Sequence, residues 1–293
     1  VIQELNETFK GNDDHANLPR KWKVAVTGDT RGSGQAEIND LGFEPATKEI
    51  DGESIKGFNV TVGGGLSRKE PRFARDIDVF VTEDEVPEVA GGLSALFRDH
   101  GDREDRFNAR IKFLVDEWGP EKLRRVLQED YVDSELRSAG EDLRDQYTYN
   151  AGRSDEIGDY VGVHEQNDGD YFVGLSVLVG RMGADDVIEL ADIAEEYGSE
   201  LIGLTQRQNI IVADIAEGDL DEFLDHDLLE YYSPDPHPFL RGSIAYTGTE
   251  YCSLSIVETK NRMVRYARWL KDNVELPDGI EEFHVHLSGC TTS

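Results

Sequence analysis

Cysteine is scarce in this chain, because only Cys252 and Cys290 occur among 293 residues. So few cysteines exclude a disulfide framework and are typical of a protein from a reducing compartment. Long apolar runs are also missing: no stretch approaches the roughly 20 residues that a membrane-spanning helix needs, and no signal peptide opens the chain. We therefore expect a cytoplasmic protein with no membrane partner.

Basic residues are few as well, with 30 Lys and Arg against 61 Asp and Glu and a formal net charge of −31. This charge argues against nucleic acid as a partner, since such binding rests on cationic contacts to phosphates. The acidic residues are spread along the whole chain. One interpretation is a well-solvated surface. The one that we favour is a halophile's cytoplasmic protein, because molar salt shortens the Debye length to about 3 Å and screens self-repulsion.

The two cysteines each follow a turn signal. Thr247-Gly248 precedes Cys252, and Ser288-Gly289 precedes Cys290. Two interpretations are open from the residues alone: buried free thiols, the common state of free cysteine, or thiolates that a turn presents to a metal or a cluster.

An unusual group of cations lies near the N-terminus, in LPRKWKVAVTGD. The alternation in WKVAVT predicts a strand. In a strand, Lys21 and Lys23 share one face and Trp22, Val24 and Val26 share the other. The lysines are either part of a solvated edge or a positive site for a small anion.

The middle of the chain predicts a ferredoxin-like plait. Strands are expected at 171–181, 200–205 and 209–215, with helices at 185–198 and 219–230. This βαββα order is typical of the plait. RNA-binding modules share it, but no basic or aromatic face is visible here. Upstream, we expect strands at 57–67 and 77–81 and helices at 84–99 and 103–118, the second ending at Gly119.

These motifs together resemble the sirohaem-dependent sulfite and nitrite reductases. The family's cluster signature is matched by TGTEYC at 247–252, ETK at 258–260 and SGC at 288–290. The segments LPRK, NDLG, VGG, VGR and LTQRQN are also similar to family segments, so that the resemblance runs from about Leu18 to Ser293.

The resemblance implies an α+β fold: sirohaem-reductase α/β domains, a ferredoxin-like half-domain and a pseudo-twofold internal repeat. The expected domains are 1–150, truncated at its N-terminus, then 158–230, the half-domain, and 235–293, truncated at its C-terminus. The repeat aligns KWKVAVTGD (21–29) with EFHVHLSGC (282–290) and places Asp29 opposite Cys290.

The resemblance also implies a function: six-electron reduction of sulfite to sulfide or of nitrite to ammonium. Sirohaem and a [4Fe-4S] cluster would be the cofactors, ferredoxin the electron donor and a small anion the substrate. Lys21 and Lys23 would contact the substrate, and Lys23 leans toward sulfite because plant-type nitrite reductases usually have asparagine there. Cys252 and Cys290 would be cluster ligands. The residues expected near the tetrapyrrole are Asn39, Gly64, Arg181, Arg207, Gln208 and Asn209.

Two departures from the family pattern bear on the cluster. Tyr246 occupies the position of the first cysteine, and the fourth would follow Ser293, so we expect this sequence to be an internal fragment. The alternative function is a non-catalytic tetrapyrrole-binding paralogue that has lost its cluster. His284 and His286 share one predicted strand face, where a metal role and a simple place in the sheet are both open.

Overall fold

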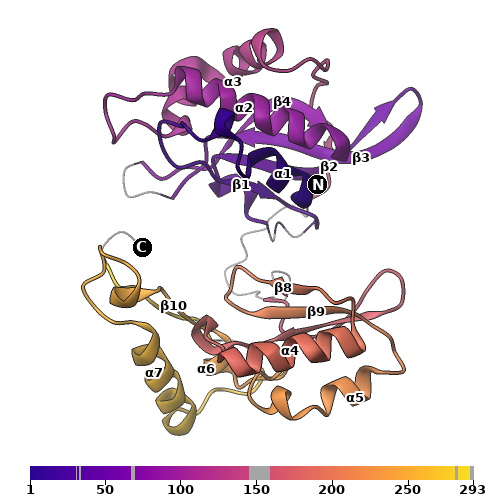
Figure 1. Ribbon diagram of the computed structural model, residues 1–293, viewed down its shortest axis with the longest axis vertical. Helices are drawn as coiled ribbons and strands as arrows, with labels where there is room; N and C mark the ends of the chain where they lie inside the picture. The colour runs from indigo at the N-terminus through magenta and orange to yellow at the C-terminus, as the bar shows by residue number, and fades with distance from the viewer. Residues whose placement is uncertain (31, 33, 67–69, 145–158, 281–282, 291–293) are drawn as a thin grey trace. The chain divides into compact units, whose positions relative to one another are not determined.

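The computed structural model describes residues 1–30, 32, 34–66, 70–144, 159–280 and 283–290. Backbone contacts divide the chain into two compact units, residues 1–151 and 152–293 (Figure 1), and each is described by itself. The domain boundary expected between 150 and 158 lies outside the described residues. The division into three domains therefore stays a prediction.

The first unit is built on a five-stranded sheet. Its strands are β1 (Val24–Val26), β2 (Leu41–Ile50), β3 (Glu53–Val62), β4 (Arg75–Val81) and β5 (Glu141–Asp142). The order is β1-β2-β3-β4, with β5 also paired to β2. Strand β1 runs parallel to β2, and the other pairs are antiparallel. The strands expected at 57–67 and 77–81 are confirmed as β3 and β4 with shifted ends, whereas β2 had not been predicted.

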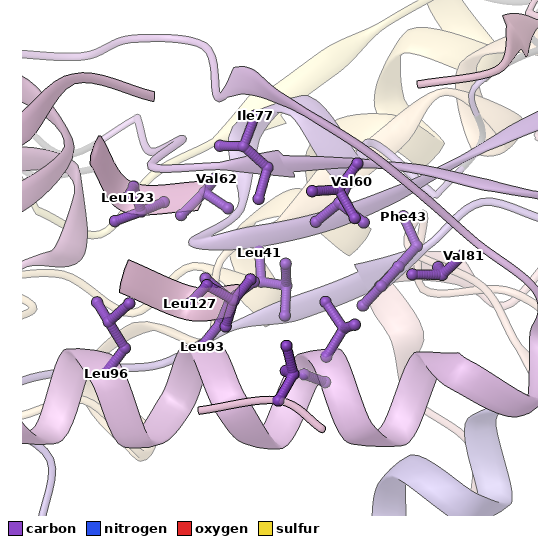
Figure 2. Close-up of a cluster of buried hydrophobic side chains, with 14 of the residues drawn as sticks. Leu41, Phe43, Val60, Val62, Ile77, Val81, Leu93, Leu96, Leu123 and Leu127 are labelled. Atoms are coloured by element: carbon purple, nitrogen blue, oxygen red, sulfur yellow. The ribbon is translucent and has the colours of Figure 1, made fainter. Parts of the chain in front are cut away.

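Helices α1 (Ile2–Phe9), α2 (Val86–His100) and α3 (Ile111–Asp130) supply the other side of the core. In α2 the apolar residues recur at helical spacing, so that one stripe is buried. Strand residues such as Leu41 and Val62 point toward Leu93 of α2 and Leu127 of α3 (Figure 2), and all four are fully buried. This packing fixes the sheet from which the predicted substrate lysines project.

The helix predicted at 103–118 is wrong at its start, and its predicted end at Gly119 is a break between two helical segments. It begins only at Ile111, because the Asp102 and Asp105 carboxylates accept hydrogen bonds from the backbone N–H groups of residues 104, 105 and 107. Such local bonds offer the backbone an alternative to helix. Gly119 has a left-handed φ of 74° and interrupts the helical geometry, but Pro120 starts a new turn and α3 continues to Asp130.

The second unit contains the predicted plait. Strands β6 (Gly162–Glu165), β7 (Tyr171–Leu175), β8 (Ile202–Leu204) and β9 (Ile210–Ile215) form an antiparallel sheet in the order β6-β7-β9-β8. Helices α4 (Ala184–Tyr197) and α5 (Leu220–Leu224) pack their apolar side chains against this sheet. The βαββα order is confirmed. The first strand and the last helix are shorter than predicted, and short 3₁₀ turns, at 178–180 and 227–230, follow each of them.

The rest of this unit is a small parallel strand pair, β10 (Ser243–Ala245) and β11 (Val285–Leu287), with helices α6 (Pro238–Arg241) and α7 (Lys260–Asn273). The α+β fold class is confirmed. In the predicted repeat, Val24 to Val26 align with Val285 to Leu287, and these are the bounds of β1 and β11. Each is also the parallel partner of a neighbouring strand.

Further 3₁₀ turns lie at 13–15, 36–38, 83–85 and 248–250. In the part of the chain that the structure describes, no helix combines the length and apolarity needed to cross a membrane.

Glu44 on β2 supplies a pH-dependent term in stability. Its side chain is 1% exposed, and burial raises the pKa of its carboxyl from 4.5 to about 7 although an Arg144 nitrogen lies 3.3 Å from Oε1. A raised folded-state pKa means tighter proton binding in the folded chain, so stability is lost as pH rises from about 4.5 to about 7.

We expect Glu44→Gln to be more stable than the parent above pH 7, by on the order of 3 kcal/mol at most, because a neutral amide avoids the buried charge. Denaturant unfolding between pH 4.5 and 8 measures this difference. Glu49→Gln, on the exposed side of the same strand, is the control. A parent protein whose stability does not fall over this range would contradict the expectation.

Candidate active site

The two predicted substrate lysines lie just before β1, because the strand is shorter than predicted and begins only at Val24, but the predicted alternation of their side chains with Trp22 is present. Lys21 and Lys23 are both exposed. Trp22 turns the other way and stacks on Phe97 of α2, with ring centroids 5.7 Å apart. The aromatic residue thus anchors the segment to the core and leaves the lysines directed to solvent.

A buried ion pair holds this segment in place. The Asp40 carboxylate is fully buried and accepts a hydrogen bond from the Lys23 backbone N–H at 3.0 Å. The Arg110 guanidinium lies 2.7 Å from the other carboxylate oxygen. Burial raises the pKa of Asp40, and Arg110 opposes that rise. The pair fixes the backbone of Lys23 and leaves its ammonium free to meet an anion.

Asn39 and Gly64, both predicted near the cofactor, lie side by side. The Gly64 N–H donates to the Asn39 carbonyl at 2.8 Å, and a Cβ on Gly64 would lie 2.4 Å from the Glu37 carbonyl oxygen. Glycine is therefore required by a close backbone approach. The Asn39 side chain donates to the Gln35 carbonyl at 2.8 Å, so its amide nitrogen is engaged within its own loop.

A hollow of about 450 Å³ opens beside Lys21. Its walls include Arg20, Arg103 and Arg106, with Glu104 as the single acidic side chain among its lining residues. Arg103 is tied down by its donation to the Asn17 carbonyl at 2.7 Å. In a chain of net charge −31 this hollow is a local positive site. The sequence analysis did not connect these arginines with Lys21, because about 80 residues separate them along the chain.

In the second unit, the VGR segment adopts a strained turn. Val179 and Gly180 have φ of 56° and 62°, and a left-handed conformation is rare for a β-branched residue. Gly180 packs against Gln208, whose Cβ lies 2.7 Å from where a Gly180 Cβ would be. The VGR and LTQRQN motifs, both predicted near the cofactor, are thus brought into contact.

Lys260, the last residue of the ETK motif, joins these two motifs to the cysteine segment. Its ammonium is buried and donates to the Val179 carbonyl and, at 3.3 Å, to the Gln208 amide oxygen. Burial lowers the pKa of Lys260, with a smaller contribution from Arg181. The Gln208 amide nitrogen donates in turn to the Ala245 carbonyl at 3.0 Å.

The rest of the ETK motif has equally local tasks. The Thr259 hydroxyl donates to the Tyr246 carbonyl, and the Glu258 carboxylate accepts from the Asn261 N–H at 2.7 Å in the first turn of α7. No local pattern in the sequence marks Lys260 as a buried cation, because its partners Val179 and Gln208 lie far from it in the chain.

Arg181 and Arg207 each contact one cysteine segment. Arg181 forms an ion pair with Glu250 of TGTEYC and donates to the Asn261 side chain at 3.3 Å. An Arg207 nitrogen lies 3.4 Å from the His284 Nδ1, just before SGC. Asn209 is buried, and its amide oxygen accepts from the Val177 N–H at 3.0 Å. Among the described residues, no group of three or more His, Cys, Asp or Glu could hold a metal ion.

The two cysteine segments are held against each other. The Tyr246 N–H donates to the Leu287 carbonyl at 3.0 Å, and the Ile256 N–H donates to the Gly289 carbonyl at 2.8 Å. The Tyr246 hydroxyl donates to the Cys252 Sγ at 3.0 Å, which lowers the pKa of that thiol, with backbone N–H groups of Leu254 and Ser255 adding to the effect. Two half-exposed thiols therefore belong to one surface, and the pKa of one of them, Cys252, is lowered by the hydrogen bonds that it accepts.

Parts of both units match families of known proteins. The family model for the nitrite and sulphite reductase 4Fe-4S domain matches residues 1–135, and the model for the nitrite/sulfite reductase ferredoxin-like half domain matches residues 164–226. The chain belongs to the nitrite and sulfite reductase family. This membership confirms the resemblance seen in the sequence, and it implies sirohaem and a [4Fe-4S] cluster as cofactors.

Individual relatives agree. The chain is 53% identical over 294 residues to the assimilatory ferredoxin-dependent nitrite reductase of Haloferax mediterranei, a match that covers 99% of this chain and 50% of that protein. It is 33% identical over 296 residues to sulfite reductase [ferredoxin] 1 of Mycolicibacterium paratuberculosis, covering 100% of this chain and 50% of that protein. The NirA protein of Mycobacterium tuberculosis matches in structure, with a TM-score of 0.81 at 30% identity over 100% of this chain and 51% of that one. The chain thus spans about half the length of the relatives that it matches.

The donor set in the described residues fits a cluster only in part. Cys252 and Cys290 would supply two of the four thiolates that a [4Fe-4S] cluster takes, and by the family resemblance Tyr246 stands in the position of a third. Its hydroxyl donates a hydrogen bond to the Cys252 Sγ, an arrangement that would be compatible with a cluster because it would stabilise a thiolate at that position.

Lys260→Met should loosen the contact between the motifs, because it removes the donor to the Val179 carbonyl and leaves that oxygen buried without its partner. We expect a loss of about 1–3 kcal/mol of folding free energy. Denaturant unfolding of the second unit's transition measures it. Lys271→Met, exposed on the same helix, is the control, and equal stability of the two variants would contradict this role for Lys260.

Proposed function

We propose that this chain is about half of a cytoplasmic, ferredoxin-dependent reductase that converts nitrite to ammonium. The observation that carries the proposal is the pair of exposed lysines just before β1, with Lys21 lining a basic hollow, in a chain that is otherwise strongly acidic. The substrate is inferred from the Haloferax mediterranei relative, which is described as a nitrite reductase and shares 53% identity.

We assign different roles to the cationic and the neutral residues of the site. The ammonium groups of Lys21 and Lys23 would bind the anion and hold protons for the oxygen that leaves as water. Asp40 and Arg110 would keep this strand in register by fixing the Lys23 backbone. Arg181 and Arg207 would neutralise carboxylates of the tetrapyrrole. Asn39, Gly64, Gln208 and Asn209 would shape the loops around it. When bound, sirohaem and the cluster would supply the anion-binding iron and single electrons, with Cys252 and Cys290 as ligands.

Lys21→Met and Lys23→Met in the full-length enzyme should each lower kcat/KM for nitrite by about 100-fold or more, because a positioned proton donor contributes about 10²–10⁴-fold. Turnover with a reduced dye measures this without a protein donor. Lys56→Met, an exposed lysine on β3, is the control. Undiminished turnover in both lysine variants, with normal iron content, would show that the strand does not carry the chemistry.

Sulfite is the second candidate substrate, and Lys23 is the residue that favours it. If the enzyme prefers sulfite, Lys23→Asn should lower kcat/KM for sulfite more than for nitrite, because the doubly charged anion loses more from the missing cation. The ratio of the two kcat/KM values, measured for parent and variant under one set of conditions, decides between the substrates. A ratio that does not change would remove Lys23 from the specificity argument.

The effect of Tyr246 on the cluster distinguishes the two hypotheses, an active reductase and a non-catalytic tetrapyrrole-binding paralogue. An intact centre should show a sirohaem spectrum and about five irons per full-length chain, one in the tetrapyrrole and four in the cluster. One iron or none would indicate a lost cluster. In that case Tyr246→Cys should raise the iron content, whereas in an intact centre it should leave the count unchanged.

A further inference from the structure

Helix α7 carries an unusual surface for this chain. Of its 14 residues, KNRMVRYARWLKDN, five are Lys or Arg and one is acidic, in a protein with 61 acidic residues against 30 basic ones. Met263, Ala267 and Leu270 face the interior. Arg262, Arg265, Tyr266 and Trp269 recur at i, i+3, i+4 and i+7, the spacing of a single helix face.

Arg268 is also exposed and adds a fifth side chain to these four. We call these five residues the α7 face, and it is open to solvent. Tyr266 is 52% exposed and Trp269 is 55% exposed. Within the described residues, none of the three arginines takes part in an ion pair, and the one hydrogen bond of the group is from Arg265 to the Asn261 carbonyl at 3.4 Å. These exposed arginines are therefore available for charges from another molecule.

The α7 face is attached directly to the cysteine segments. Thr259, just before the helix, donates to the Tyr246 carbonyl, and the Tyr246 hydroxyl donates to the Cys252 Sγ. Figure 1 places α7 beside β10, the strand that leads into Tyr246, at the margin of its unit. A partner on this face would therefore lie next to the residues proposed to hold the cluster.

We propose that the α7 face docks a small acidic electron-carrier protein. The proposal rests on the proposed function, which requires a donor of single electrons. Charge complementarity identifies the partner: arginines steer and orient an acidic protein, while Trp269 and Tyr266 provide the aromatic contacts that dominate binding energy in interfaces. Aromatic contacts matter here because molar salt limits electrostatic attraction to a few ångströms. The acidic residues of this chain also repel an acidic carrier over most of the surface outside α7. The carrier is thereby guided to the α7 face.

The test uses the full-length enzyme with Arg262, Arg265 and Arg268 all replaced by Glu. Titration with oxidised ferredoxin measures affinity without turnover, and we expect binding at least 10-fold weaker than for the parent. KM for reduced ferredoxin should rise by a similar factor, while kcat with reduced methyl viologen stays within 2-fold. The matched control replaces Lys10, Lys56 and Arg125, exposed cations of the first unit, by Glu, with the same change in net charge.

Unchanged ferredoxin affinity in the α7 variant would overturn the proposal, as would an equal loss in the control. So would loss of single-stranded RNA binding with ferredoxin binding intact, because it would assign the face to nucleic acid. Should the triple variant fail to fold, Trp269→Ala and the single Arg→Gln variants replace it, with weakened ferredoxin binding again expected. If the parent reduces neither anion with methyl viologen, the proposed function fails, yet the titration still decides whether the α7 face binds the carrier.

Discussion

The ammonium of Lys260 lies at the first position of a helix, where the helix dipole disfavours a cation, and it is almost excluded from water. It is held there by the Val179 carbonyl and the Gln208 amide oxygen. Without this cation, the left-handed turn at Val179 and Gly180 would leave a buried carbonyl unpaired, at a cost of about 1–3 kcal/mol. The contact links the turn before Arg181, the loop that carries Gln208 and the start of α7.

The first unit also contains a buried charged group, but there it is an anion and not a cation. Asp40 is buried, and its charge is tolerated because Arg110 and the Lys23 N–H converge on it. In both units a buried ion fixes backbone: Asp40 holds the Lys23 N–H, and Lys260 holds the Val179 carbonyl. In a chain with twice as many acidic as basic residues, positive charge is concentrated at three places: the segment before β1, the hollow beside it and α7.

Local patterns accounted for much of the fold. The alternation in WKVAVT correctly oriented Lys21, Lys23 and Trp22, and the βαββα order of the plait was recovered. Strand β2 was missed although Asp51-Gly52, with left-handed φ at both residues, is a hairpin signal between it and β3. The start of α3 was misplaced because the competing bonds of Asp102 and Asp105 depend on side-chain geometry. A helical pattern over the same residues does not reveal that competition.

The sequence by itself determined the family, the fold class, the common orientation of the two lysines and the identity of the two thiols, since each depends on residue type and short spacing. Tertiary structure alone decided which distant groups meet: Lys260 with Val179, Arg181 with Glu250, Arg207 with His284, and Arg103 with the hollow beside Lys21. These contacts join residues that are far apart in the chain and are created by packing of whole elements. No local pattern encodes them, because the free energy that selects them comes from burial of the surrounding core.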